Sequence, residues 1–247
     1  MSATVALSLF AASFVASALN VIAGGGSFLT LPVLLYVGLP APAANATNRV
    51  GVVVQSLTAV LGFHRHRVLD WRWATGVGVP TALGSALGAW LALGVGELQF
   101  RQLLAAVMVL LSLWTLLGAG GHTLPAARFL AGRPWLVRMG FFAVGVYGGF
   151  IQAGIGFLLL ALTTIAGFDL VRGNAIKVLA VTLQTFAALA VFMGAGQVRW
   201  PEGAALAMGG VLGSLVGVRL AVLKGHRWLQ VVVTISMVAF ALRLLFP

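Results

Sequence analysis

Long apolar stretches dominate the chain and define its expected elements. They cover roughly residues 3–22, 28–38, 44–62, 73–93 and 100–118, and again 138–153, 157–168, 174–193, 202–223 and 228–246. The period-two alternation of strands is absent, and lipid admits only helices or closed barrels because every backbone polar group needs a partner. The pattern therefore predicts an all-α, polytopic membrane helix bundle.

The polar and small residues that interrupt these stretches recur at a constant spacing of 129 residues, the separation of Gly25 and Gly154. Other matched pairs are Asn45 and Asn174, Gln55 and Gln184, and Trp71 and Trp200. Such matches are informative in a chain that is 61% hydrophobic. We predict two membrane repeats, residues 1–118 and 138–247, joined by a linker at 119–137 that is richer in Pro, Gly and Arg.

The second segment of each repeat is too short to cross a membrane. It has about 11 or 12 residues, where a helical span needs about 20. Each short segment follows a glycine cluster, which permits a backbone break where the break faces protein or a cavity. The glycines are Gly24, Gly25 and Gly26 in the first repeat, and Gly154 and Gly156 in the second. We predict a broken hairpin in each repeat with its bend inside the membrane; helix packing through small residues is the alternative.

Charge is scarce and mostly positive. Charged residues make up 8% of the chain, with 15 Lys and Arg against 4 Asp and Glu. The basic residues stand singly in short loops and at helix ends, which fits the positive-inside rule and argues against nucleic-acid binding. Placing the loops near 63–73, 119–137 and 219–227 inside puts both termini outside and makes the repeats antiparallel, as in many secondary transporters.

Candidate chemistry lies at the start of the third segment of each repeat. The first repeat has Asn45, Asn48 and Arg49 there, and the second has Asn174 and Lys177. Helix N-termini, amides and a Lys together suit a small oxyanion. The alternatives are helix capping by the Asn residues and a Lys177 that reaches the membrane interface. Arg49 has no cation at the matching position and is either an interface anchor or a substrate contact.

Gln55 and Gln184 lie ten residues beyond the paired Asn residues, near mid-membrane. They are expected to face inward, because lipid would leave their amides unpaired. The predicted substrate-binding residues are therefore Gly24, Gly25, Gly26, Asn45, Asn48, Arg49, Gln55, Gly154, Gly156, Asn174, Lys177 and Gln184. We expect Lys177→Ala to abolish transport while the protein still folds.

Other chemistry finds little support in the chain. The four acidic residues map to loops or segment ends, and cysteine is absent, so no cofactor and no carboxylate or thiolate metal site are expected. Hydrolase and metalloprotease motifs are missing, and we predict that the protein is not an enzyme. Gly84-x-x-x-Gly88 and Gly213-x-x-x-Gly217 are interpreted as helix-packing seams.

Residues 20–50, with a glycine triplet, Pro32, Gly-Leu-Pro and the run Ala-Asn-Ala-Thr-Asn, resemble the sulfite exporter TauE/SafE family. Residues 152–177 repeat a weaker form, with Ala161 in place of the proline. The resemblance spans nearly the whole chain. It implies a multi-pass protein of the cytoplasmic membrane that moves sulfite or organosulfonate-type anions.

For such a transporter we expect alternating access, by rocking of one repeat against the other. An anion-selective channel and a membrane scaffold without transport remain alternatives. The expected partners are a small anionic substrate and the lipid bilayer, without nucleic acid, and an oligomer is compatible with the sequence.

Overall fold

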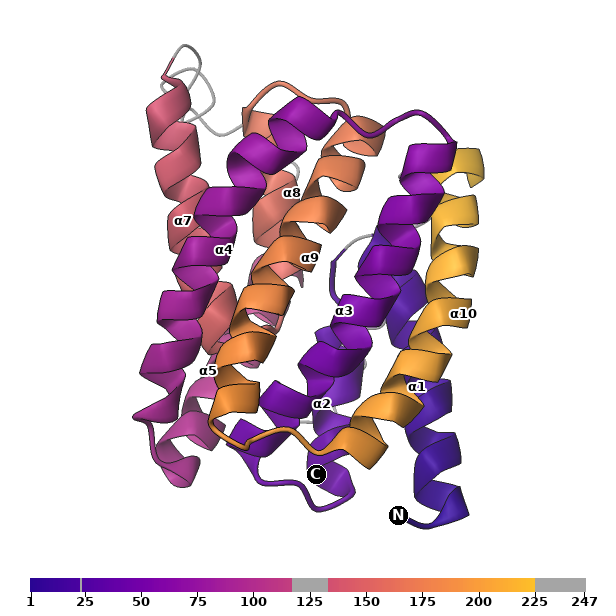
Figure 1. The fold of residues 1–247 in the computed structure, drawn as a ribbon, viewed down its shortest axis with the longest axis vertical. Coiled ribbons are helices and arrows are strands. Elements are labelled where there is room, and N and C mark those ends of the chain that lie inside the picture. Colours follow the sequence, from indigo (N-terminus) through magenta and orange to yellow (C-terminus); the bar gives the residue numbers. More distant parts are fainter. Residues whose placement is uncertain (23, 117–132, 225–247) are drawn as a thin grey trace.

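The structure, a computed structural model, describes residues 1–22, 24–116 and 133–224 (Figure 1). Within these ranges the ordered elements are all helices, as predicted. They are α1 (Ala3–Ile22), α2 (Ser27–Tyr36), α3 (Ala41–Arg65), α4 (Trp71–Leu93), α5 (Glu97–Leu116), α7 (Pro134–Phe150), α8 (Ile155–Ile165), α9 (Leu170–Gly194) and α10 (Trp200–Lys224). Most of the expected linker and the expected segment at 228–246 lie outside the described residues.

The helices follow the first nine predicted segments, with ends that differ by a few residues. α7 begins at Pro134, inside the expected linker, because proline suits the first helical position, where its missing N–H costs nothing. α9 begins four residues earlier than predicted, because the Asp169 carboxylate accepts hydrogen bonds from the N–H groups of Val171 and Arg172. Terminal capping, rather than the apolar pattern, sets these boundaries.

The helices form two lobes, and each lobe includes one helix that belongs to the other predicted repeat. The first lobe contains α1, α2, α3 and α10, and the second contains α4, α7, α8 and α9 (Figure 1). Each lobe thus combines three consecutive helices of one predicted repeat with the fourth helix of the other. The lobes meet mainly where α3 packs against α9, while α5 contacts α3. A residue on α3 or α9 can therefore reach across from one lobe to the other.

The two glycine seams hold the exchanged helices in place. On α4, a Cβ at Gly84 or Gly88 would collide with main-chain carbonyls of α7. On α10, a Cβ at Gly213 or Gly217 would meet main-chain carbonyls of α1 in the same way. The interpretation of both motifs as packing seams is confirmed, and both seams act within a single chain.

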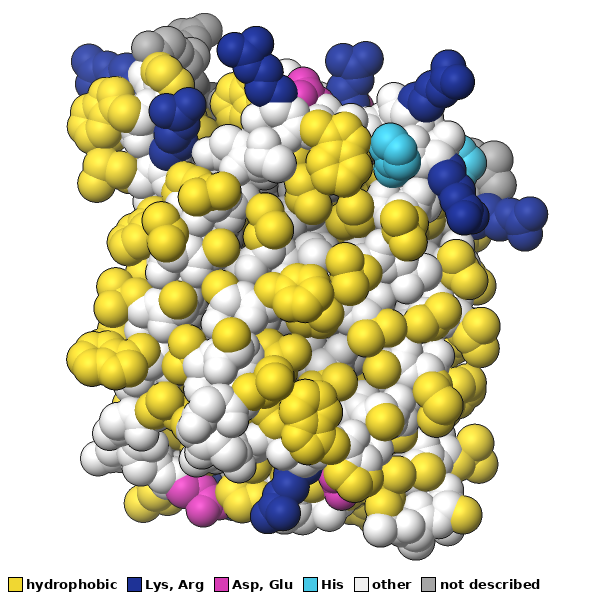
Figure 2. All heavy atoms as spheres, in the orientation of Figure 1, with side chains coloured by type: hydrophobic (Ala, Val, Ile, Leu, Met, Phe, Trp, Pro, Cys, Tyr) yellow, Lys and Arg dark blue, Asp and Glu magenta, His cyan; other side chains and the backbone are white. Residues whose placement is uncertain are grey.

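The helices matched by the 129-residue spacing run in opposite directions along the long axis of Figure 1: α1 against α7, α3 against α9, and α4 against α10. We interpret this arrangement as an inverted repeat. Lys, Arg and His gather at one end of the molecule (Figure 2), where α3 ends and α4, α7 and α9 begin. We call this the basic end, and the positive-inside rule predicts that it faces the cytoplasm.

Four described helices are long and apolar enough to cross a membrane: α1, α4, α9 and α10. α3 is as long as α9 but carries Asn45, Asn48 and Arg49, all buried within the protein. α3 and α9, which carry most of the buried polar side chains, therefore lie inside the bundle, while α1, α4 and α10 are more exposed, the distribution expected of a multi-pass membrane protein.

Candidate functional site

The two predicted helix breaks are present, and they touch each other. α1 and α2 are separated by residues 23–26, and α7 and α8 by residues 151–154. Gly24 and Gly154 have φ values of +94° and +71°, in the left-handed region that favours glycine. A Cβ on Gly24 would collide with the main chain of Gly156, and one on Gly156 with that of Gly24. The bends of the two hairpins therefore meet back to back inside the bundle.

The predicted site glycines are thus buried at or beside this meeting point. A Cβ on Gly26 would collide with the carbonyl of Ala16, which shows how closely α2 folds back on α1. Gly25 and Gly154 complete the two turns. The geometry gives these glycines a packing role, and their contact with substrate stays a prediction.

Arg49 crosses from α3 to the end of α7 in the other lobe. Its side chain is fully buried, and Nη2 donates to the carbonyl oxygens of Gly148 at 3.1 Å and Gly149 at 2.6 Å. Its Cζ lies 4.9 Å from the ring centroid of Phe192 on α9. The Nε and Nη1 atoms are buried without a hydrogen-bond partner. Arg49 is thus not an interface anchor, and two of its donors are available to a ligand.

No acidic side chain neutralises this guanidinium. All four acids of the chain are described, and each lies at the start of a helix. They are Asp70 and Asp169 as caps of α4 and α9, and Glu97 and Glu202 in the first turns of α5 and α10. This confirms their predicted places. A buried cation without a counter-ion is costly, and an anion bound beside it would recover part of that cost.

Lys177 makes the corresponding contact in the opposite direction, from α9 to the end of α1. It is 1% exposed, and Nζ donates to the carbonyl oxygens of Asn20 at 3.1 Å and Val21 at 3.3 Å. The side chain does not extend to the membrane interface, so that alternative is wrong. The carbonyl end of a helix is its negative pole, where a cation is favourable.

Arg49 and Lys177 make equivalent contacts, although position-by-position matching of the two repeats does not pair them. Gly149 and Asn20 are related by the 129-residue spacing, and each accepts a hydrogen bond from the basic residue of the other repeat. Arg49 and Lys177 are one position out of register, so Arg49 aligns with Val178 and Lys177 with Asn48. The feature of the sequence that indicates this correspondence is a single basic residue inside the third predicted segment of each repeat.

The paired Asn residues are not helix caps, contrary to the alternative. The N-cap position is Pro40 in α3, without a side-chain cap, and Asp169 in α9, whose carboxylate caps the helix. Asn45 reaches the α7–α8 break, where Nδ2 donates to the Phe150 carbonyl at 3.0 Å and Oδ1 accepts from the Gln152 N–H at 3.4 Å. The Oδ1 atom of Asn174 is buried without a partner. The Asn45 amide thus serves the lobe interface rather than its own helix.

Asn48 has a local role. Its Oδ1 accepts from Thr30 Oγ1 at 2.6 Å, and its Nδ2 donates to Ser27 Oγ at 3.2 Å, both on α2. Both of its polar groups are therefore satisfied within the first lobe. Lys177 occupies the matching position in the second repeat and crosses between the lobes instead.

Gln184 and Gln152 carry further buried, unpartnered polar atoms at or near the α7–α8 break. Gln184 on α9 is fully buried, with both amide atoms unpartnered, and its Oε1 lies beside Gly148, whose carbonyl binds Arg49. Gln152 in the α7–α8 break donates to Thr185 Oγ1 at 3.1 Å and has an unpartnered Oε1. We did not predict Gln152, because the matching position in the first repeat is an alanine. Arg49, Gln152 and Gln184 are called the arginine site below.

Gln55, the partner of Gln184 in the repeat, has a different setting. It lines a small cavity in the first lobe, about 10 Å³, together with Ser13, Thr30 and Asn48. A space of that size holds at most one water molecule. Gln55 therefore faces the protein interior, as predicted, but it lies among groups that are already paired.

The model of the sulfite exporter TauE/SafE family matches residues 9–244. The chain belongs to the sulfite exporter TauE/SafE family. It is 32% identical over 236 residues to a "Probable membrane transporter protein" of Haemophilus influenzae, which covers 92% of this chain and 89% of the relative.

Two further relatives extend the comparison. Identity is 30% over 239 residues to the "Probable membrane transporter protein YfcA" of Escherichia coli K12, covering 96% of this chain and 88% of the relative. It is 28% to "Probable membrane transporter protein ORF9" of a Sinorhizobium species, covering 96% and 91%. No solved structure matches the chain significantly. This TauE/SafE protein is a multi-pass membrane transporter, and its helical fold agrees with that assignment.

Proposed function

We propose that this TauE/SafE protein carries small sulfur oxyanions, sulfite or organosulfonates, and that Arg49 is their principal ligand. The observation that carries the proposal is a fully buried guanidinium with two free donors and no acidic side chain to neutralise it. Charge-assisted hydrogen bonds from such donors are roughly twice as strong as neutral ones. An oxyanion beside Nε and Nη1 supplies both the missing charge and the missing acceptors.

The unpartnered amides suit the remaining atoms of such a ligand. The side chain of Gln184 both donates and accepts, and Gln152 offers a free acceptor. A sulfur oxyanion has several acceptor oxygens, and its protonated form adds a donor. The helix N-terminus of α8, which begins at the same break, adds a favourable dipole. These features support a compact oxyanion better than an elongated apolar solute.

Transport by alternating access would separate the lobes rather than the repeats. Because α4 and α10 are exchanged, the packed units are the two lobes, and we revise the expected rocking of repeat against repeat accordingly. Arg49, Asn45 and Lys177 each bind the end of a broken helix in the opposite lobe. Motion between lobes would therefore change the contacts of these three residues first.

The test is flux in proteoliposomes with sulfite, sulfoacetate, a longer sulfonate and acetate. Purified wild type is compared with Arg49→Met and with Arg219→Met, which removes an exposed arginine of α10 by the same substitution. We expect saturable flux of at least one sulfur oxyanion, its loss in Arg49→Met, and its retention in Arg219→Met. Absence of flux of every anion from folded wild type would overturn the proposal. Equal flux in wild type and Arg49→Met would remove Arg49 as the ligand.

A further inference from the structure

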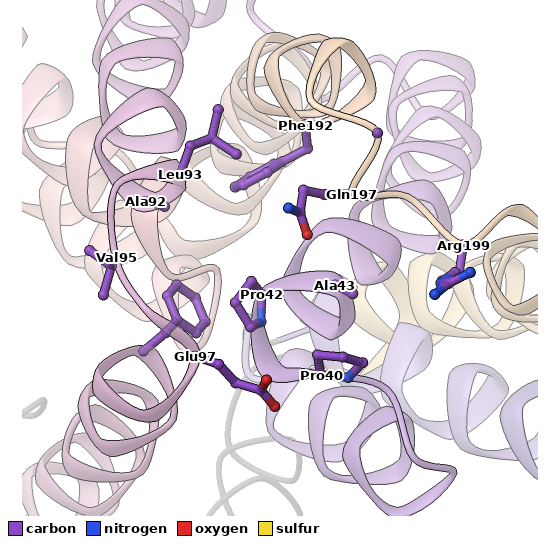
Figure 3. A pocket seen from close by; sticks show the side chains of 12 residues that line it. Pro40, Pro42, Ala43, Ala92, Leu93, Val95, Glu97, Phe192, Gln197 and Arg199 are labelled. Atoms are coloured by element: carbon purple, nitrogen blue, oxygen red, sulfur yellow. The ribbon is translucent and has the colours of Figure 1, made fainter.

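An open pocket lies at the end of the molecule opposite the basic end. It has a volume of about 400 Å³ and is formed where the start of α3, the α4–α5 connection and the α9–α10 connection come together. Glu97 and Arg199 lie at its exposed margin, while Phe100 and Phe192 form buried parts of its wall. In Figure 3 the side chains of Phe192 and Gln197 project into the space in front of Pro42 and Ala43.

The ring of Phe192 separates this pocket from the arginine site. One side of the residue lines the pocket, and Arg49 Cζ lies 4.9 Å from the ring centroid. Arg49 itself does not line the pocket and has no exposed surface. Its unpartnered Nε and Nη1 atoms therefore lie one aromatic side chain away from a space open to the outside.

Two other parts of the pocket wall, Phe100 and the main chain of Arg199, are tied to neighbouring elements. Phe100 stacks on Phe150 with ring centroids 5.8 Å apart, and the Phe150 carbonyl is bound by Asn45. The main-chain N–H of Arg199 donates to Thr47 Oγ1 at 3.0 Å, which fixes the α9–α10 connection to α3. By contrast, Phe192 lies in the last turn of α9, just before Gly194 and Gly196, and Gly196 has φ of +66°. Its ring is thus the part of the wall best placed to move.

We propose that this pocket is the external vestibule of the transport pathway and that Phe192 is the gate between the vestibule and the arginine site. The proposal rests on the proposed function and names the entry route and a gating residue for the same small anion. In the closed gate the ring covers the guanidinium through a cation–π contact. When the ring turns aside, Arg49 faces the vestibule, and an anion that enters can replace the ring as its partner.

Labelling of single cysteines tests the gate without any need for flux, because the chain has no native cysteine. Gln197→Cys places a thiol in the vestibule. Thr185→Cys places one on the same face of α9 as Phe192, about 10 Å deeper along the helix. Each is made in the full chain with native Phe192, with Phe192→Ala, and with Phe186→Ala. Phe186 is the matched control, an exposed phenylalanine on the outer face of α9.

The probe is 2-sulfonatoethyl methanethiosulfonate, a small impermeant anion, added to intact cells that express the protein. We expect Gln197→Cys to react rapidly in every background, and Thr185→Cys to react slowly with native Phe192. Phe192→Ala should raise the Thr185→Cys rate by at least about tenfold, as for a shift toward an open state, and Phe186→Ala should not. Phe192→Leu, with a smaller side chain but a similar apolar character, serves if the alanine variant fails to fold.

Three results would overturn the gate: Thr185→Cys reacting as fast as Gln197→Cys with native Phe192, no acceleration in folded Phe192→Ala or Phe192→Leu, or equal acceleration by Phe186→Ala. A Gln197→Cys thiol that does not react from outside would overturn the vestibule. The labelling pattern is independent of substrate, so it stands if no sulfur oxyanion is transported. Failure of the gate likewise leaves the flux assay of wild type and Arg49→Met intact.

Discussion

The two helix breaks of this transporter are held by different cations, and only one of these cations keeps unpartnered hydrogen-bond donors. At the α1–α2 break, Lys177 directs Nζ to two carbonyl oxygens at the end of α1. At the α7–α8 break, Arg49 serves two carbonyl oxygens with Nη2 alone and keeps two further nitrogens free. Lys177 thus caps the end of one helix, whereas Arg49 caps the end of another and also keeps donors that a ligand could use.

The surroundings of the two breaks follow the same division. Near the α1–α2 break, Asn48 is satisfied by Ser27 and Thr30. Near the α7–α8 break, the amides of Gln152 and Gln184 have unpartnered atoms. Buried polar atoms without partners are rare in folded proteins and often mark functional positions. The difference predicts that substrate binds at the second break, while the first gives the fold its matching half.

The largest effect is expected where the breaks touch. Gly24→Ala should abolish folding or destabilise the protein by more than about 3 kcal/mol, because the new Cβ collides with the main chain of Gly156 as well as straining φ. Gly38→Ala is the matched control, since its φ is +92° and no atom lies within 4 Å of a Cβ there. It should cost only the strain, about 1–2 kcal/mol. Thermal unfolding in detergent measures both; equal stability of the two variants would contradict the contact.

The second-largest effect is expected when the unpartnered donors of Arg49 are removed. Arg49→Met should lower saturable flux by at least about 100-fold, because charged hydrogen bonds to the anion are lost. Its thermal stability should change little, because removal of an unneutralised buried charge offsets the loss of two hydrogen bonds. Arg49→Lys should recover little flux, because an ammonium group cannot both cap α7 and present two further planar donors. Full recovery by lysine would show that the two cations are equivalent.

Lys177 gives the reciprocal test. We expect Lys177→Ala to abolish transport and to lower the melting temperature, because two carbonyl oxygens at the end of α1 lose their partner and, unlike methionine at position 49, alanine leaves a cavity. Lys177→Arg should retain much of the flux, since a guanidinium can also cap a helix end. Normal flux in a folded Lys177→Ala protein would remove this residue from the mechanism. Flux assays beside thermal unfolding of the same preparations give both readings.

The smallest effect is expected from replacing Gln184, and the same replacement of Gln55 is the comparison. Gln184→Met should raise the KM about tenfold by removing a ligand amide, and it should raise the melting temperature by about 2–4 °C because two unsatisfied buried atoms disappear. Gln55→Met, the matched change in the other repeat, should leave the KM near the wild-type value. A Gln184→Met protein that is less stable than wild type would indicate that the amide has partners in the folded state.

The helices were largely predictable from the sequence, because a helix that crosses a membrane requires a long run of apolar residues. The short second segments and their glycines correctly indicated the breaks, since few residues other than glycine tolerate φ near that of Gly24. Gln55 and Gln184 were predicted to face inward because lipid leaves their amides unpaired. Asn45, Arg49 and Lys177 were predicted as substrate-binding residues, and the structure excludes the alternatives of helix capping, an interface anchor and a Lys that reaches the membrane interface. Their importance for substrate stays a prediction.

What the sequence alone determined is the membrane class, the helical content, the places of the breaks and the polar residues inside the bundle, all of which follow from local hydropathy and backbone preference. Only the tertiary structure decided which lobe each helix joins, that Gly24 meets Gly156, and that Arg49 and Lys177 play corresponding parts despite a one-residue offset. It also placed Phe192 between a pocket and Arg49. The physical reason is that these contacts join residues 99 or more positions apart, and hydropathy carries no information about which partner a buried cation or carbonyl will find.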